Sequence, residues 1–259
     1  MYNTVKYEVE GARLTITMNR PDTYNAFNNE MSYELRDALK NASKDDNIRV
    51  VTLTGEGKAF CSGQDLKDVQ GAEGRSLGES VENRYNPIIK HIRKMEKPVL
   101  CRLNGVGAGA GCSLALACDL TIASEKASLI EVFVNAGLVL DSGSSYFLPR
   151  LIGYNKAFEL ATTGRKVKAD EAKELGLVNE VVAHDELDQK VEEWAAYYEK
   201  APTKAVGMIK KMLSKSAHSD LETMLQYEAY SQEIAGRTED YQEGLNAFNE
   251  KRTPEFKGK

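Results

Sequence analysis

The sequence predicts an α/β fold: a largely parallel β-sheet with helices between its strands, followed by a helical C-terminal region. In the first part of the chain, short apolar runs alternate with stretches of helical spacing, and strands separated by helices usually pair in parallel. After about residue 155 the strand pattern almost disappears, and helical periodicity continues to the end. We therefore expect an α/β core over residues 1–195 and a C-terminal helical region over residues 196–259.

The first elements follow from their periodicity. Leu14, Ile16 and Met18 alternate with threonines, which is typical of a half-buried strand, and Gly11 predicts a turn back to a strand at residues 5–9. Residues 28–43 have helical spacing that places their apolar side chains on one face.

The later elements continue this alternation. Three runs are predicted as strands: RVVTLTG (49–55), PVLCRLNG (98–105) and DLTIAS (119–124). Residues 76–96 are helical in pattern, but Pro87 predicts two helical pieces or a kink. Five more helices are expected, at residues 169–175, 186–199, 203–216, 221–235 and 239–250.

The composition favours a soluble globular protein. The chain has 259 residues, 42% of them hydrophobic and 28% charged, which is enough to bury a large core. Its net charge of −5 gives no general attraction to nucleic acids or anionic membranes, although Lys210, Lys211 and Lys215 gather on one predicted helix. The first ten residues lack the apolar segment of a secretion signal, and residues 129–140, the longest apolar stretch, are too short to span a bilayer. We therefore expect a cytoplasmic protein with no membrane segment.

The cysteines and histidines argue against metal, disulfide and nucleophilic chemistry. Four cysteines without paired spacing are expected to be reduced core residues: Cys61, Cys101, Cys112 and Cys118. Three histidines lie in charged surroundings, with no Ser-His-Asp set around them: His91, His184 and His218. We expect neither a metal site nor a hydrolase triad.

Two glycine-containing loops follow predicted strands. In AFCSGQDL (59–66) and NGVGAGAGCS (104–113), small residues precede a helical turn, so backbone N–H groups are left without helical partners. The second loop runs G-x-G-x-G from Gly107 to Gly111 and does not fit the dinucleotide-binding pattern. Two interpretations stay open: tight strand-to-helix packing that needs no side chain, or two N–H donors that form an oxyanion hole.

One carboxylate stands alone in the stretch NAGLVLDSGSS (135–145). Asp141 follows an apolar run and precedes a flexible, hydroxyl-rich turn. It has the pattern of a helix N-cap, and it also has the pattern of a lone acid or base at the edge of an apolar site. The residues around it leave both interpretations open.

Several motifs occur together in a fixed order. They are NRPDTYNAF (19–27), AFCSGQDL (59–66), NGVGAGAGCSLALACD (104–119), FLPRLIG (147–153) and FNEKRTPEF (248–256). With them the chain resembles, from end to end, the crotonase family, also called the enoyl-CoA hydratase/isomerase family. The resemblance implies a spiral of β-β-α turns and C-terminal helices that assemble homotrimers, usually stacked as hexamers. It also implies an acyl-coenzyme A substrate and no metal or redox cofactor, since coenzyme A arrives with the substrate.

The resemblance also implies roles for individual residues. The backbone N–H groups of Gln64 and Ala110 would hold the thioester oxygen. Seven residues would contact the coenzyme A bound to their own subunit: Tyr24, Ala26, Ser62, Gly63, Gln64, Asp65 and Leu66. Phe248 and Lys251 would reach the coenzyme A of a neighbouring subunit. Residues 67–90 would surround the acyl group, whose identity the sequence does not specify.

Two departures from the family pattern bear on the reaction. Family hydratases carry glutamates at the positions of Ser113 and Phe133, which together with Leu138 are expected to line the substrate pocket. Hydration needs carboxylates to activate water and to protonate carbon, so classical hydration is disfavoured. Glu131 lies two residues before Phe133, which does not by itself restore the missing group. Asp141 remains, at a position where several isomerases and benzoyl-CoA dehalogenases of the family keep an aspartate.

The pattern around Asp141 most resembles the isomerases of phenylacetate catabolism, which act on ring-epoxidised phenylacetyl-CoA. We therefore expect an isomerase in which Asp141 moves a proton of a β,γ-unsaturated acyl-CoA through an enolate held by the N–H groups. The alternatives are an enoyl-CoA hydratase, a non-catalytic CoA-ester or RNA-binding homologue, and a halobenzoyl-CoA dehalogenase. The histidine base of a dehalogenase would fall at Asn86, five residues from His91.

Overall fold

The computed structural model describes residues 2–69 and 76–259 and contains two β-sheets. The larger has the strand order β1-β2-β3-β5-β7-β10, with β1 Val5–Glu10, β2 Arg13–Met18, β3 Val50–Gly55, β5 Val99–Leu103, β7 Leu120–Ser124 and β10 Glu180–Val182. The smaller has the order β4-β6-β8-β9, with β4 Ala59–Cys61, β6 Val106–Ala108, β8 Ser128–Ile130 and β9 Val167–Lys168. Pairing is parallel except for β1 with β2 and β8 with β9, which confirms the largely parallel sheet.

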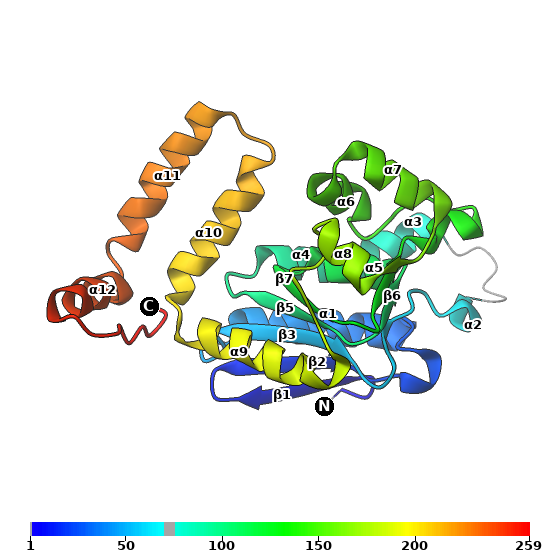
Figure 1. Ribbon diagram of the computed structural model, residues 1–259, viewed down its shortest axis with the longest axis horizontal. Helices are drawn as coiled ribbons and strands as arrows, with labels where there is room; N and C mark the ends of the chain where they lie inside the picture. Colours follow the sequence, from blue (N-terminus) through cyan, green and yellow to red (C-terminus); the bar gives the residue numbers. More distant parts are fainter. Residues whose placement is uncertain (1, 70–75) are drawn as a thin grey trace.

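Each turn of the chain contributes one strand to each sheet. The pairs β3 and β4, β5 and β6, and β7 and β8 follow one another in sequence, and the two members of each pair lie in different sheets. Helical segments follow each pair and lie against the sheets (Figure 1). This is the spiral of β-β-α turns that the family resemblance implied.

The helices of the core have these bounds: η1 Pro21–Thr23, α1 Asn29–Lys44, α2 Leu66–Val69, α3 Leu77–Ser80, η2 Val81–Tyr85, α4 Asn86–Lys94, α5 Ala110–Ala117, η3 Val132–Ala136, α6 Ser144–Ile152, α7 Tyr154–Thr163, α8 Ala169–Glu174 and η4 His184–Glu186. Helix α1 begins where the Asn28 side chain accepts a hydrogen bond from the Met31 N–H at 2.9 Å. The predicted break near Pro87 is confirmed: η2 is a π-helical turn, and Pro87 lies in the first turn of α4.

Several elements were not predicted, among them the four strands of the smaller sheet, strand β10 and helix α7. Strand β10 pairs with β7 at the end of the larger sheet, and α7 follows α6 directly. Three residues are too few to show a period of two, so β10 is defined by the exposed edge of β7 that it pairs with rather than by its own pattern.

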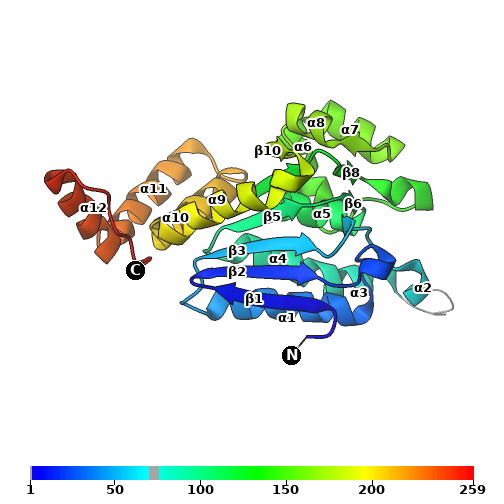
Figure 2. The ribbon, with the colours of Figure 1, turned by 60° about the horizontal axis from the view of Figure 1, so that its bottom comes forward.

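The C-terminal helices are α9 Leu187–Lys200, α10 Thr203–Ser216, α11 Leu221–Ala235 and α12 Glu239–Glu250, close to the predicted ranges. Helix α9 packs on the larger sheet, where Leu187, Val191 and Ala195 meet strand side chains such as Leu100. Helices α10 to α12, which we call the arm, extend away from the sheets on the side opposite α2 (Figures 1 and 2).

Lys210 joins the arm to the core. Its Nζ is buried, lies 2.6 Å from an Asp119 carboxylate oxygen and donates to the main-chain oxygen of Ile92 at 2.7 Å. Burial lowers the pKa of Lys210, and the charge of Asp119 opposes this shift. The prediction of a lysine cluster on this helix is therefore wrong for Lys210, which forms an ion pair inside the protein. Lys211 pairs with Glu96 at the surface.

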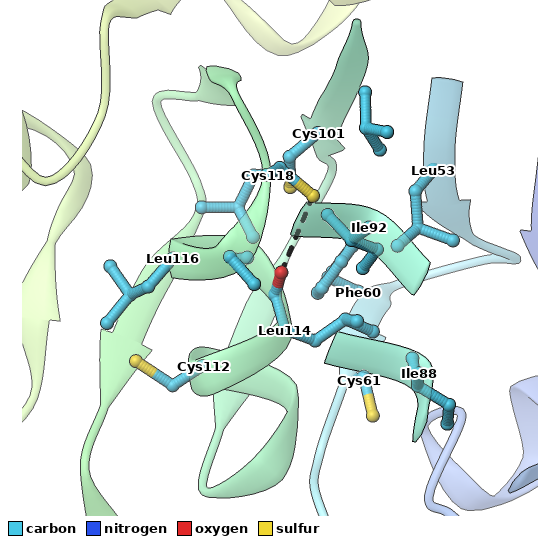
Figure 3. Packing of buried hydrophobic residues seen from close by; sticks show 14 of the residues in the cluster. Leu53, Phe60, Cys61, Ile88, Ile92, Cys101, Cys112, Leu114, Leu116 and Cys118 are labelled. Atoms are coloured by element: carbon cyan, nitrogen blue, oxygen red, sulfur yellow. Dashed lines mark hydrogen bonds between the residues drawn. The ribbon is translucent and has the colours of Figure 1, made fainter. Parts of the chain in front are cut away.

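The four cysteines are free and buried, as predicted. Figure 3 shows Cys101 and Cys118 together in the core, where the Cys118 thiol donates to the Leu114 main-chain oxygen at 3.4 Å. Burial raises the pKa of Cys61 to about 12, so its thiol stays protonated. Among the described residues, no helix is both long enough and apolar enough to cross a membrane.

Candidate active site

The two glycine loops meet at the carboxyl ends of neighbouring strands. Strands β4 and β6 are parallel, with Cys61 opposite Gly107, so the loops that follow them lie side by side. Gly63 has φ +91°, and a Cβ on it would lie 2.8 Å from the Ala108 main-chain oxygen and 3.6 Å from the Ala110 nitrogen. The approach of the two loops therefore requires glycine at position 63.

Two backbone N–H groups are left over at this junction. Phe27 bonds to both neighbours of Gln64, accepting from Asp65 and donating to Gly63, so in this parallel bridge the Gln64 N–H points away from Phe27. Ala110 is the first residue of α5 and has no carbonyl before it in the helix. Within residues 2–69 and 76–259, no backbone acceptor bonds to either N–H. An oxyanion hole needs two such donors, one from each loop.

Side chains hold the first loop in place. Gln64 Nε2 donates to the Phe27 main-chain oxygen at 2.8 Å, and Gln64 Oε1 accepts from the Tyr85 hydroxyl at 2.5 Å. Arg20 bonds to an Asp65 oxygen at 2.9 Å. Burial raises the pKa of Asp65, but the hydrogen bond and charge of Arg20, together with the hydrogen bonds from the Lys67 and Asp68 N–H groups, outweigh it, so the net pKa is lowered. Sequence reasoning missed Arg20 and Tyr85, because nothing local to either residue indicates its partner.

Asp141 lies in the turn between η3 and α6. Helix α6 begins at Ser144, its N-cap is Gly143, and no side chain caps it, so the N-cap interpretation of Asp141 is wrong. The Asp141 carboxylate accepts from the Ser142 hydroxyl at 2.7 Å, and its main-chain oxygen accepts from the Ser144 N–H at 3.0 Å. Burial raises the pKa of Asp141 against the opposing hydrogen bond from Ser142. The turn is formed by backbone bonds, which leaves the carboxylate free of a capping role.

A small, mostly apolar recess lies between α4, the start of α5 and the turn that contains Asp141. It is lined by Phe27, Tyr85, Ile88, Ile89, Ala110, Leu114 and Ser142. Ala110 carries one of the two free N–H groups, and Ser142 is the neighbour of Asp141 and its hydrogen-bond partner. Ala110 and the hydrogen-bond partner of the Asp141 carboxylate thus line the same small space.

The other predicted pocket residues take different positions. Phe133 is buried, and its ring lies beside the second loop, 3.9 Å from where a Cβ on Gly109 would be. Leu138 is partly exposed, whereas Ser113 is completely buried behind the recess, with its hydroxyl 2.6 Å from the Ser144 hydroxyl. Of residues 67–90, positions 70–75 lie outside the described part of the chain.

Sequence reasoning undervalued Glu131. Its side chain is buried at 3% exposure, and its Oε1 lies within hydrogen-bond distance of the Ser144 hydroxyl oxygen, at 2.8 Å. Burial raises the pKa of Glu131 to about 7, and the negative charge of Asp141 adds to the shift. A polar side chain placed between apolar Ile130 and Val132 is the sequence signal that could have indicated a buried acid.

The residues expected to contact coenzyme A divide into two groups. Tyr24 is 56% exposed and accepts from the Ser62 N–H at 3.0 Å, so residues 20–27 and 62–66 lie side by side, next to exposed Leu66. Buried Ala26 lies in the first of these segments. Phe248, 83% exposed, belongs to α12 in the arm, and Lys251 is the C-cap of that helix, on the side of the molecule opposite α2 (Figure 1). The structure therefore does not bring Phe248 and Lys251 to these two segments within one chain.

The histidines lie elsewhere. His91 is on α4 but faces charged residues of α1; burial lowers its pKa, and Lys40 and Arg36 lower it further. It is not among the residues that line the recess. In the described part of the chain, no three His, Cys, Asp or Glu side chains form a group that could hold a metal ion.

Comparison with known proteins identifies close relatives over the whole chain. The enoyl-CoA hydratase/isomerase family model matches residues 8–259. The chain is 40% identical to the 1,2-epoxyphenylacetyl-CoA isomerase of Escherichia coli (strain K12), with 100% of both chains covered. It is 38% identical to a Rhodobacter capsulatus protein named "Probable enoyl-CoA hydratase", covering 100% of this chain and 99% of the relative. The fold matches the crystal structure of an enoyl-CoA hydratase from Bacillus anthracis with a TM-score of 0.95, at 36% identity and covering 99% of this chain and 100% of that chain.

Proposed function

The chain belongs to the enoyl-CoA hydratase/isomerase family, and we propose that it is an isomerase that moves a double bond of a β,γ-unsaturated or ring-epoxide-derived acyl-CoA. The observation that carries this proposal is the identity of the side chains at three positions. Ser113 and Phe133 occupy the positions expected for the two hydratase glutamates, and Asp141 supplies a carboxylate that is hydrogen-bonded to Ser142, a residue that lines the recess. The similarity to an epoxyphenylacetyl-CoA isomerase supports the same choice.

The first step binds and polarises the thioester. Its carbonyl oxygen accepts from the Gln64 and Ala110 N–H groups, which carry no other backbone bond among the described residues. These donors stabilise the negative charge that develops on the oxygen when the α-proton leaves. Because both belong to fixed backbone, little reorganisation is needed as the charge forms.

Asp141 moves the proton. Its ionised carboxylate takes a proton from the α-carbon, the electron pair passes into the enolate, and the carboxylic acid returns the proton to the γ-carbon. The C–C double bond moves into conjugation with the thioester, and no atom is gained or lost. Burial raises the pKa of Asp141 and so makes its carboxylate a stronger base, which suits abstraction from carbon. With a ring epoxide, the same enolate would form as the strained ring opens.

The proposal extends to assembly and cofactors. We propose a homotrimer or hexamer, cytoplasmic, in which the arm of one subunit meets another, and a reaction without a metal or redox cofactor. Large apolar side chains along the arm are exposed in the single chain, which supports association: Leu213 68%, Leu221 74%, Leu225 50%, Tyr230 63% and Phe248 83%. Light scattering on the purified protein tests this part, and a monomer at micromolar concentration would contradict it.

A hydratase is the second candidate, because a relative of nearly equal identity carries that name. Turnover of two esters distinguishes the two functions: 3-hexenoyl-CoA and crotonyl-CoA, each followed by absorbance of the conjugated enoyl thioester. An isomerase gains absorbance with the first and loses none with the second. Loss of crotonyl-CoA absorbance at an enzymatic rate would reject the argument from Ser113 and Phe133.

A further inference from the structure

A buried chain of polar groups connects Glu131 to both halves of the proposed site. Ser144, the first residue of α6, and Ser113, in α5, are fully buried, and their hydroxyl oxygens lie 2.6 Å apart. The Ser144 hydroxyl lies 2.8 Å from Glu131 Oε1. The Ser113 hydroxyl lies 3.2 Å from the main-chain oxygens of both Gly109 and Asp141. This series of hydrogen-bonded groups therefore ends at the main-chain oxygens of Asp141 and of Gly109, the residue before Ala110.

The number of protons determines which way the hydrogen bonds run. Three successive links join Glu131 to Ser144, Ser144 to Ser113, and Ser113 to the main-chain oxygens, which only accept. The two serine hydroxyls supply one proton each. The third must come from the carboxyl group of Glu131, which then donates to Ser144. Only a protonated Glu131 fills every link.

An ionised Glu131 leaves the chain one proton short. Ser144 then donates to the carboxylate, and the proton of Ser113 must serve two links. If Ser113 donates to Ser144, the main-chain oxygens of Gly109 and Asp141 lose their hydroxyl donor. If Ser113 instead donates to the main-chain oxygens, the hydroxyl oxygens of Ser113 and Ser144 lie 2.6 Å apart with no proton between them, which is repulsive. In both cases the link between Glu131 and Asp141 is broken.

We propose that Glu131 is a positioning residue that, while protonated, fixes Asp141 and the start of α5 relative to each other through Ser144 and Ser113. This inference rests on the isomerase function proposed above. Activity is then retained while Glu131 holds its proton and falls when it ionises.

The surroundings of Glu131 favour the protonated form. Its second oxygen, Oε2, is buried and has no hydrogen-bond partner among the described residues, which disfavours a charge there. The titratable groups that act on Glu131 are the Cys112 thiol of α5, which hydrogen-bonds to its carboxyl group, and the Asp141 carboxylate. Burial raises the pKa of Cys112, so this thiol stays neutral. Burial also raises the pKa of Glu131 to about 7; the hydrogen bonds from Ser144 and Cys112 oppose this shift, and the charge of Asp141 adds to it.

The test compares the pH dependence of kcat/KM for 3-hexenoyl-CoA, from pH 5 to 9, in the wild type and Glu131→Gln. A glutamine amide donates to Ser144 at every pH and cannot ionise. The kcat/KM of the wild type should rise with pH as Asp141 ionises. It should then fall as Glu131 ionises, to about tenfold below its plateau at one pH unit above the Glu131 pKa. Glu131→Gln should keep the rise and lack the fall. The matched control Glu125→Gln, at an exposed glutamate, should keep both.

Two results would overturn the inference: a wild-type profile without a fall up to pH 9, or a fall of the same size and midpoint in Glu131→Gln. Ser144→Ala gives a second check, because it cuts the chain without removing an acid. This variant should have lower kcat at every pH and no falling limb. A profile like that of the wild type would reject the connection through Ser144.

Binding separates this inference from the isomerase function. Calorimetric affinity for the saturated thioester butyryl-CoA, measured at pH 6 and pH 8.5, does not need turnover. Severalfold weaker binding to the wild type at the higher pH, absent in Glu131→Gln, would uphold the positioning role even if 3-hexenoyl-CoA were not turned over. Equal pH dependence of binding in the two proteins would overturn it, whatever the turnover.

Discussion

Replacing Gly63 by alanine tests the proposed oxyanion hole directly. The added Cβ would lie 2.8 Å from the Ala108 main-chain oxygen, a backbone atom that cannot rotate away, and the residue has φ +91°. The unfavourable φ costs about 1–2 kcal/mol, and displacing a packed backbone costs about 1–3 kcal/mol more. The clash moves the two loops apart at the point where the Gln64 and Ala110 N–H groups converge.

The expected loss of activity is larger than the loss of stability suggests. Removing one oxyanion donor typically lowers kcat by about 10²- to 10³-fold. We therefore expect Gly63→Ala to fold, with a melting temperature lower by several degrees, and to lose at least about 10²-fold in kcat/KM for 3-hexenoyl-CoA.

Gly137→Ala is the matched control. Gly137 also has a positive φ, +69°, but a Cβ there meets no atom within 4 Å. Gly137→Ala should lower the free energy of unfolding by about 1–2 kcal/mol and leave kcat/KM within severalfold of the wild-type value. If Gly63→Ala and Gly137→Ala lose equal activity, the convergence of the two loops is not what stabilises the enolate, and the proposed hole is wrong.

Three further predictions concern single side chains. Asp141→Asn should lower kcat by about 10²- to 10⁴-fold while butyryl-CoA still binds by calorimetry; an active variant would reject the acid/base role. Asp119→Asn leaves the buried Lys210 ammonium without its carboxylate and should lower the free energy of unfolding by about 3–5 kcal/mol in urea titrations, whereas Lys211→Met, at an exposed ion pair, should change it by less than about 1 kcal/mol. Because the folded-state pKa of Glu131 is raised to about 7, its contribution to stability is present below about pH 4.5 and is lost as pH rises to about 7, by roughly 3 kcal/mol in all. Glu131→Gln should remove that part of the pH dependence of the melting temperature, and a variant with an unchanged pH dependence would show that another group titrates.

The role of Asp141 could not be decided from its local sequence pattern. Its sequence context fits an N-cap and a catalytic acid equally well, because both need a short polar side chain before a helix. The structure decides against the cap, since Gly143 precedes the first turn of α6 and the Asp141 carboxylate bonds to Ser142 instead. The recess lined by its partner Ser142 is completed by Ala110 and Leu114 of α5, which are distant in sequence.

The sequence by itself determined the elements whose cause is local. Period-two alternation marked β2, helical spacing marked α1 and the helices of the arm, and Pro87 marked the break before α4. The two glycine loops could also be predicted, because a strand, small residues and a helix start occur within one short segment. The ordered motifs gave the family, which the family model confirmed over residues 8–259.

The tertiary structure alone decided which groups meet. It placed the Gln64 and Ala110 loops side by side through the pairing of β4 with β6, buried Lys210 against Asp119, and joined Glu131 to Asp141 through Ser144 and Ser113. Each of these contacts joins different elements of the fold, and burial in the folded chain is what raises the pKa of Glu131. Periodicity and propensity describe a residue relative to its sequence neighbours, whereas hydrogen bonding and desolvation depend on neighbours that only folding supplies.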